Sequence, residues 1–255
     1  MIEIKTGEKP ASADAVVRDC SHCTIRHRAV CSRCQPHELV ALEKIKSYKL
    51  YKPGETVVWG GEPLDFVGTV VTGAATLSKS LEDGRRQIVG LVLPGDFIGR
   101  PGREHAAYDV TAVSEVLVCR FQRKPFEELL GRFPNLENRL LEISLDELDA
   151  AREWMLVLGR KTARERIASF LANIARRFAA LRRQPLGQCI EFDMPLTREA
   201  MADFLGLTLE TVSRQLSALK RDGLIRITQN RHVVIPDFMA LLVEAGEDAD
   251  GGLVS

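Results

Sequence analysis

Apolar and polar residues alternate at helical spacing in two short stretches between Leu196 and Arg221, in the sequence LTREAMADFLGLTLETVSRQLSALKR. Thr197 and Thr208 stand where the two helices need N-terminal caps, and Gly206 stands where the first helix needs a left-handed residue to end it. The pattern predicts a helix-turn-helix, and the β runs within LIRITQN and RHVVIPD predict a wing after it. Such a unit places its second helix in the major groove of DNA, and an ordinary helical hairpin is the alternative.

A different pattern fills the chain between about Leu50 and Phe121. Short runs rich in Val, Ile and Thr are separated by Pro-Gly, Gly-Gly and Asp-Gly pairs, as in TVVWGG and DVTAVSEVLVCRF. Because β-branched residues favour strands and these pairs favour turns, the segment predicts a β-roll or jelly roll. Cys119 lies in the last of the predicted strands.

The stretch from about Pro134 to Gly159 predicts one long helix. Its apolar residues recur at steps of 4, 3, 3, 4 and 3, which is close to the 3.5-residue period of a two-stranded coiled coil. We expect this row to form the seam of a homodimer, and packing of the helix against its own domain is the alternative. The residues of the predicted seam are Leu141, Leu145, Leu148, Ala151, Met155 and Leu158.

Composition limits the class of protein. The chain is 45% hydrophobic and 27% charged, as in ordinary soluble proteins. It contains no apolar run of the ~18 residues that a membrane span needs, and its N-terminus has no signal-peptide core. We therefore expect a cytoplasmic protein with no membrane partner, whose six cysteines are reduced or metal-bound.

The net charge is zero, but the charges are unevenly distributed along the chain. Residues 160–236 carry 14 Lys and Arg against 7 Asp and Glu, whereas residues 237–255 carry 5 acidic residues and no basic ones. The positive charge thus coincides with the predicted helix-turn-helix, as binding to DNA phosphates requires. The acidic end, which includes EAGEDADGG, is expected to be a disordered, solvated tail.

Four cysteines, Cys20, Cys23, Cys31 and Cys34, lie within fifteen residues near the N-terminus. Thiolates bind zinc and iron–sulfur clusters, and a two-residue gap lets both sulfurs of a pair face one centre. The spacing alone leaves zinc and iron–sulfur equally open. Cys189, between the long helices and the winged unit, is expected to be a small buried residue.

A β-roll, a long helix and a winged helix in this order resemble the CRP/FNR family of bacterial transcription regulators. The segments GLTLETVSRQLSALKRDGLI and ARERIASFLANIARRFA carry the closest resemblance. The N-terminal cysteines together with Cys119 are similar to the FNR branch, whose members respond to oxygen, and the seven-residue gap resembles its FnrN and FnrL type.

The resemblance implies an α+β fold divided into six parts. These are a flexible leader (1–19), a cysteine-rich cluster-binding segment (20–35), an N-terminal β-roll sensor domain resembling cyclic-nucleotide-binding domains (36–133), a dimerisation helix (134–159), a C-terminal winged helix-turn-helix (160–236) and an acidic tail (237–255).

The resemblance also implies a cofactor and a switch. Cys20, Cys23, Cys31 and Cys119 would hold a 4Fe–4S cluster, with Cys34 as the alternative to Cys31. The cluster would promote a homodimer that binds double-stranded DNA at an inverted repeat of the TTGAT type. Molecular oxygen would destroy the cluster and weaken DNA binding. Surface turns of the β-roll, such as the one around residues 82–86, would contact RNA polymerase.

The outward side of the predicted second helix supplies candidate DNA contacts. Arginine can bond guanine O6 and N7 together, and glutamate can accept from cytosine N4, so the two suit a G·C pair. Candidates for base contacts are Glu210, Ser213 and Arg214, and candidates for phosphate contacts are Thr197, Thr208 and Lys220.

Two alternatives stay within the same family: a regulator with structural zinc, and a regulator with a small-molecule effector such as a cyclic nucleotide. Relatives that bind a cyclic nucleotide need Arg followed by Ser or Thr before the last strands. In PGDFIGRPGREHAAYDV, Ala106 and Ala107 occupy that place, with Arg100 and Arg103 nearby. The chain has no Ser-His-Asp order, phosphate loop or HExxH motif, so we do not expect an enzyme.

Overall fold

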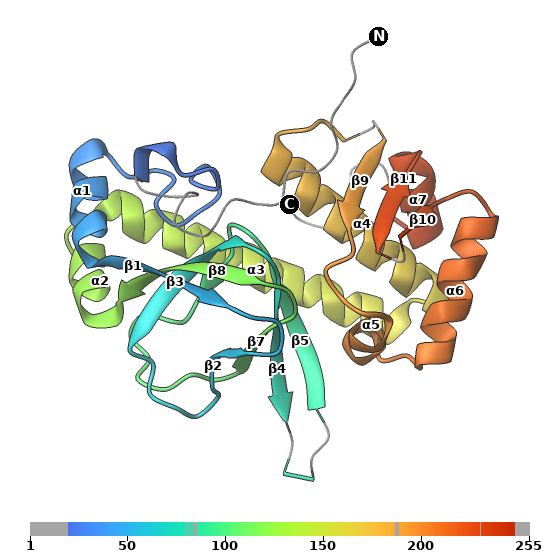
Figure 1. Ribbon diagram of the computed structural model, residues 1–255, viewed down its shortest axis with the longest axis horizontal. Coiled ribbons are helices and arrows are strands. Elements are labelled where there is room, and N and C mark those ends of the chain that lie inside the picture. Colours follow the sequence, from blue (N-terminus) through green and yellow to red (C-terminus); the bar gives the residue numbers. More distant parts are fainter. Residues whose placement is uncertain (1–19, 81, 84–85, 187–188, 230, 248–255) are drawn as a thin grey trace.

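The computed structural model describes residues 20–80, 82–83, 86–186, 189–229 and 231–247. A β-roll and a mainly helical C-terminal domain lie side by side along one long helix, α3, which spans Pro134–Arg160 (Figure 1). The predicted leader, residues 1–19, lies outside the described residues. None of the described helices is long and apolar enough to span a membrane.

The β-roll consists of two four-stranded antiparallel sheets, ordered β1-β8-β3-β6 and β2-β7-β4-β5. Between them lies an apolar core that includes Val70, Val110 and Val118. The strands are β1 (Lys46–Tyr51), β2 (Thr56–Val58), β3 (Phe66–Thr72), β4 (Ala75–Ser80), β5 (Arg86–Val92), β6 (Phe97–Ile98), β7 (Asp109–Ala112) and β8 (Val116–Gln122). The β-roll expected from the glycine-punctuated runs is confirmed.

Strand β1 was not among the predicted runs. Its sequence, KSYKLY, is rich in charged and aromatic residues, and only Tyr51 is fully buried. The strand forms nevertheless because it pairs along its whole length with β8, from Lys46 opposite Phe121 to Tyr51 opposite Val116. Its pairing partner is about 70 residues away in the sequence, which local periodicity does not reveal.

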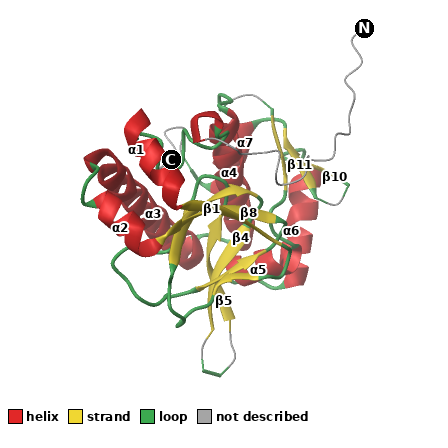
Figure 2. Cartoon of the chain, turned by 60° about the vertical axis from the view of Figure 1, so that its left-hand side comes forward, coloured by secondary structure: helices red, strands yellow, loops and turns green. Residues whose placement is uncertain are grey.

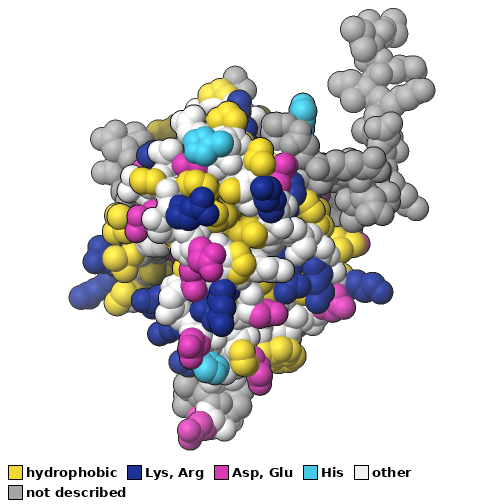
Figure 3. Space-filling model, turned by 90° about the vertical axis from the view of Figure 1, so that its left-hand side faces the viewer, with side chains coloured by type: hydrophobic (Ala, Val, Ile, Leu, Met, Phe, Trp, Pro, Cys, Tyr) yellow, Lys and Arg dark blue, Asp and Glu magenta, His cyan; other side chains and the backbone are white. Residues whose placement is uncertain are grey.

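Helices α1 (Pro36–Ile45) and α2 (Arg123–Leu130) flank the roll beside the first half of α3 (Figure 2). They enclose a second apolar core, in which Phe126 stacks on Phe121 of β8. The surface at this end of the molecule mixes basic, acidic and apolar side chains (Figure 3).

The C-terminal domain confirms the predicted helix-turn-helix and wing. Its helices are α4 (Ala163–Arg182), α5 (Arg198–Leu205), α6 (Leu209–Arg221) and α7 (Phe238–Ala245), and its strands are β9 (Ile190–Asp193), β10 (Arg226–Thr228) and β11 (His232–Ile235). The three strands form one sheet in the order β10-β11-β9. Strands β10 and β11, which follow the helix-turn-helix, are the wing.

The prediction of an acidic tail from residue 237 is wrong for its first part. Asp237 caps α7 by accepting a hydrogen bond from the backbone N–H of Ala240 at 3.1 Å. Phe238, Leu241 and Leu242 then fall at helical spacing and are buried against the core that includes α4. The net charge of the segment concealed this apolar face. Residues 248–255 lie outside the described residues.

The two domains share apolar contacts. Ile88 of β5 and Leu93 after it belong to the same buried cluster as the core of the C-terminal domain. The side-chain amide of Gln87 donates a hydrogen bond to the backbone carbonyl of Asp203 in α5, at 2.9 Å. The first helix of the helix-turn-helix therefore packs directly on the roll.

Candidate DNA-binding surface and cysteine site

The local chemistry of the helix-turn-helix is as the sequence predicts. The hydroxyl oxygen of Thr197 accepts from the backbone N–H of Ala200, and that of Thr208 from Thr211, both at 3.2 Å. Gly206 ends α5 with a φ of 61°, a left-handed conformation that a residue with a side chain adopts at a cost. These features fix where α6 starts.

The predicted contact residues lie on the accessible side of α6. Glu210, Arg214 and Lys220 are exposed, whereas Ser213 is half-buried. The guanidinium of Arg198, at the start of α5, donates to the Ser213 hydroxyl at 3.4 Å. Arg198 is a basic residue of this surface that the sequence analysis missed, because its proximity to Ser213 depends on how the two helices cross.

The two predicted threonine contacts differ in their free hydrogen-bonding capacity. Thr197 and Thr208 are both exposed and both cap a helix. The Thr208 hydroxyl also donates to the hydroxyl of Thr211 at 3.0 Å, so its proton is already engaged. Thr197 is therefore better placed to donate to a phosphate.

The cysteine segment, residues 20–35, covers the outer face of the sheet that contains β8. Cys23, Cys31 and Cys119 pack around one small apolar cluster formed by Ile25, Ala29, Val71 and Leu117. Cys20 begins the segment in a short 3₁₀ turn, Cys20–His22, and is buried. The structure thus brings Cys119 of β8 to the N-terminal cysteines, although 88 residues separate it from Cys31 in the sequence.

Cys31 and Cys34 occupy different surroundings. Cys31 packs beside Cys119 in both apolar clusters that the segment contacts. Cys34 is buried only in the cluster formed with α1 and α2, and the ionisable groups that influence its pKa are Glu38, Arg26 and Cys20. Of the two, Cys31 is the one on the Cys119 side of the segment.

Three of the cysteines in and beside this segment have strongly raised pKa values. Burial, together with the neighbouring cysteines, raises the pKa of Cys31 and of Cys119 to about 12. Burial also raises the pKa of Cys34 to about 12. Because metal ligands are thiolates, any metal uptake here must displace protons.

All six cysteines are free thiols in the structure, and Cys189 is exposed rather than buried as expected. Cys189 directly precedes β9, on the surface of the C-terminal domain. Among the described residues, no three His, Cys, Asp or Glu side chains are close enough to hold a single metal ion.

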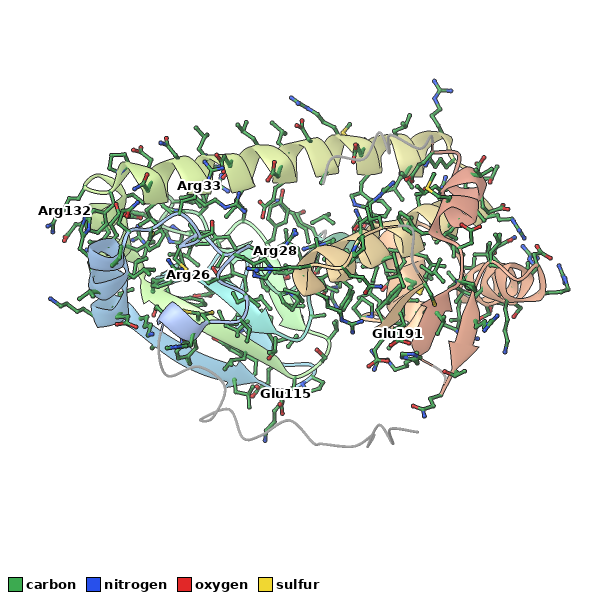
Figure 4. The ribbon with its side chains drawn as sticks, turned by 90° about the horizontal axis from the view of Figure 1, so that it is seen from above. Arg26, Arg28, Arg33, Glu115, Arg132 and Glu191 are labelled. Atoms are coloured by element: carbon green, nitrogen blue, oxygen red, sulfur yellow. The ribbon has the colours of Figure 1, made fainter. Side chains whose placement is uncertain are left out.

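The cysteine segment is tied to α3 by arginines. Arg33 forms an ion pair with Glu142 at 2.6 Å, and Arg139 donates to the backbone carbonyl of Arg28 at 3.2 Å. Arg139 and Glu142 also pair with each other at 3.1 Å. Figure 4 shows Arg33 beside α3 and Arg28 extending from the segment toward α4.

The same segment contacts the C-terminal domain. Leu181 of α4 packs against the cluster around Ile25 and Ala29. Burial and the nearby Arg177 guanidinium lower the pKa of Arg28, whose side chain lies over Gly95 in a turn of the roll. The cysteine segment is therefore in contact with the roll, the long helix and the C-terminal domain.

The predicted seam lies mostly on the outer side of α3. Leu141, Leu145, Leu148, Ala151 and Met155 are exposed, with Met155 74% accessible, while Leu158 is half-buried. On the opposite side, Ile143 and Val157 are buried in the molecule's own core. Leu156, which was not predicted, adds a further exposed apolar side chain next to Met155.

Trp154 connects α3 to the helix-turn-helix. Its ring packs edge-on against Phe204 of α5, with ring centroids 4.7 Å apart, and Phe204 in turn contacts Phe170 of α4. A movement of α3 at Trp154 would therefore be transmitted directly to α5 through this contact.

The resemblance would place Arg followed by Ser or Thr near residues 106 and 107 in a cyclic-nucleotide regulator, and this chain has two alanines there. Ala106 packs against the apolar interior of the roll, and Ala107 is half-buried beside it. Arg100 and Arg103 are both exposed on the loop before them.

Two family models match the chain. A cyclic nucleotide-binding domain matches residues 48–133, and a Crp-like helix-turn-helix domain matches residues 165–243. The second match extends into α7, in agreement with its packing on α4.

Several known proteins are similar to this one over most of its chain. The transcriptional activator protein FnrL of Cereibacter sphaeroides is 62% identical over 238 residues, 93% of this chain and 96% of that protein. The nitrogen fixation regulation protein FixK of Bradyrhizobium diazoefficiens is 39% identical, over 82% of this chain and 86% of that protein. The structure of FixK2 from Bradyrhizobium japonicum superposes with a TM-score of 0.71 at 33% identity, covering 80% of this chain and 100% of that one. The chain belongs to the CRP/FNR family of DNA-binding transcription regulators, within its FNR branch.

Proposed function

We propose that this protein is an oxygen-responsive transcription regulator that binds a 4Fe–4S cluster through Cys20, Cys23, Cys31 and Cys119. The observation that carries the proposal is the position of Cys119, on the outer face of the roll against the cysteine segment. Four thiols from two distant parts of the chain suit a cluster with soft ligands. The buried Thr69 hydroxyl lies opposite Cys119 and has no hydrogen-bond partner among the described residues. It could donate to a sulfide of the cluster.

When bound, the cluster supplies an oxygen-labile crosslink between the N-terminal segment and β8. Ordering of the N-terminal segment would then affect α3, because two contacts join them. Arg33 pairs with Glu142 of α3, and Arg139 of α3 donates to the backbone carbonyl of Arg28. An ordered segment favours one position of α3 and thereby the seam on its outer side. A segment released from Cys119 retains these contacts only at an entropic cost.

The exposed row on α3 is proposed to pair with the same row of a second copy. A two-fold dimer presents two α6 helices, which suits an inverted repeat of TTGAT-type half-sites. Simultaneous binding of both half-sites multiplies the affinity, so loss of the dimer weakens DNA binding. The relatives named activators suggest that this protein also activates transcription, with RNA polymerase as its partner in the cytoplasm.

The first test is the iron and acid-labile sulfide content of protein purified without oxygen. We expect about four irons and four sulfides per chain, and visible absorbance that bleaches when air is admitted. Cys119→Ser and Cys31→Ser should abolish the cluster, whereas Cys34→Ser and the exposed Cys189→Ser should retain it.

One zinc per chain and no sulfide would contradict the redox proposal and leave a regulator with structural zinc. A cluster that survives in Cys31→Ser but not in Cys34→Ser would show that Cys34, and not Cys31, is the third N-terminal ligand. In either case the DNA-binding role of α6 would stand.

A further inference from the structure

The outer face of the sheet presents a row of side chains to the cysteine segment. Cys119 of β8 is directly opposite Tyr48 of β1 on one side and Thr69 of β3 on the other. Side chains of directly opposed residues in antiparallel strands lie on the same face of the sheet. The outward packing of Val67 and Val71, which flank Thr69 in β3, agrees with this direction.

One side chain of β1 already donates to a cysteine sulfur, and a second lies beside one. The ammonium of Lys46 lies 3.1 Å from the Cys20 sulfur and 3.3 Å from the Glu43 carboxylate, with only 11% of the Lys46 side chain exposed. Glu43 in turn accepts from the backbone N–H of Cys20 at 2.9 Å, which fixes the pair. The Tyr48 side chain lies opposite Cys119 in the sheet and packs in the same apolar cluster, so its hydroxyl is the second candidate donor.

The third donor has no acceptor. Thr69 is 2% exposed, and its hydroxyl has no hydrogen-bond partner among the described residues. A buried hydroxyl without a partner is costly, so it is uncommon unless a missing group satisfies it. A sulfur placed against this face of the sheet would supply the acceptor.

We propose that Lys46, Tyr48 and Thr69 are positioning residues that donate hydrogen bonds to sulfurs of the cluster site. The inference rests on the proposed function. It adds hydrogen-bond donors from β1 and β3 to the cysteine ligands of the site. Hydrogen bonds to cluster sulfurs stabilise the more negative state and raise the reduction potential, and such outer partners also orient the ligands. These three donors would therefore set how readily the site is oxidised and how tightly it is held.

The test uses Lys46→Met, Tyr48→Phe and Thr69→Val in the full-length protein. Each variant removes the donor and keeps the approximate shape of the side chain. Lys49→Met is the matched control for charge, because Lys49 lies on the same strand but is exposed, over the ring of Tyr51. Thr111→Val in β7 is the matched control for a hydroxyl in the other sheet of the roll.

We expect the three variants to bind the cluster but to have more negative midpoint potentials than the wild type and the controls. Iron release to a chelator should be about 10-fold faster or more in each variant. Thr69→Val should also leave the metal-free protein as stable as the wild type or more so in urea, because it removes an unsatisfied hydroxyl.

Unchanged potentials and unchanged iron release in all three variants would overturn the inference and leave the cluster proposal intact. If the wild type contains zinc and no sulfide, the cluster proposal itself fails. Chelator-driven zinc release then decides the donor role: faster release in Lys46→Met and Tyr48→Phe supports it, and unchanged release overturns it. A wild-type protein that binds no metal overturns both proposals.

Discussion

The side chains best placed to read DNA are few and differ in kind. Arg214 is exposed on α6 and can form two parallel hydrogen bonds with guanine. Lys220 is exposed near the end of the same helix and offers a point charge suited to a phosphate. Ser213 is oriented partly by Arg198, so it belongs to a small network rather than acting alone.

Arg214→Ala should cost about 1–3 kcal/mol of binding free energy and relax the preference at a single base position. The reason is the loss of a bidentate contact to one base edge. Binding to a panel of half-sites with single substitutions, measured at fixed salt, checks it. Lys220→Ala is the control, expected to weaken all sequences alike and to lower the salt slope by about 1. An equal loss of affinity for every half-site in the Arg214→Ala variant would indicate that Arg214 contacts a phosphate and not a base.

At the scale of the element, replacing two glycines at or near helix ends by alanine should change the free energy of unfolding in opposite directions. Gly206 has a φ of 61° in the turn of the helix-turn-helix, whereas Gly159 is helical and has open space where a Cβ would lie. Gly206→Ala should destabilise the protein by about 1–2 kcal/mol, and Gly159→Ala should stabilise it by about 0.5 kcal/mol. Urea unfolding measures both. If both substitutions changed the free energy of unfolding by the same amount, the turn at Gly206 would have to relax to accept a side chain.

Helix α3 carries the prediction about assembly. Leu145→Glu places a charge in the middle of the exposed apolar row, so in a two-fold dimer two carboxylates would oppose each other across the seam. We expect the variant to sediment as a monomer at concentrations where the wild type is a dimer. Val40→Glu, an equally exposed apolar position on α1, should leave the dimer intact. A Leu145→Glu dimer would place the interface elsewhere.

The elements that periodicity predicts are those whose structure depends on neighbours in the sequence. The caps Thr197 and Thr208 and the left-handed Gly206 each act within one turn of helix. Helix α7 was missed because the net charge of its segment concealed its apolar face, whereas strand β1 was missed because it is stabilised by a partner far along the chain, β8. The same limit hid Lys46 and Tyr48, whose positions beside Cys20 and Cys119 depend on the register of β1.

At the scale of the whole molecule, an ion pair between described residues joins the domains. Arg177 of α4 pairs with Asp96 in a turn of the roll and also donates to the backbone carbonyl of Leu91 at 3.3 Å. Arg28 of the cysteine segment approaches the same group of charges. The position of the C-terminal domain is therefore coupled to both the roll and the cysteine segment.

Arg177→Gln should weaken the docking of the C-terminal domain on the roll by ~1 kcal/mol, because both paired side chains are only about a quarter exposed. Hydrogen exchange should become faster in β5 and α5, where the domains touch. Arg164→Gln is the control, since Arg164 pairs with Glu244 and Asp222 inside the C-terminal domain. Unchanged exchange in β5 would mean that the apolar contacts suffice for docking.

The contact between Trp154 and Phe204 has an optical consequence. The chain has two tryptophans, and the other, Trp59, is 62% exposed on the roll. In a Trp59→Phe protein, all the indole emission would arise from the junction between the long helix and the helix-turn-helix. The natural fluorescence of that protein would therefore report the angle between these helices in real time, as air is admitted or DNA is added, without any attached dye.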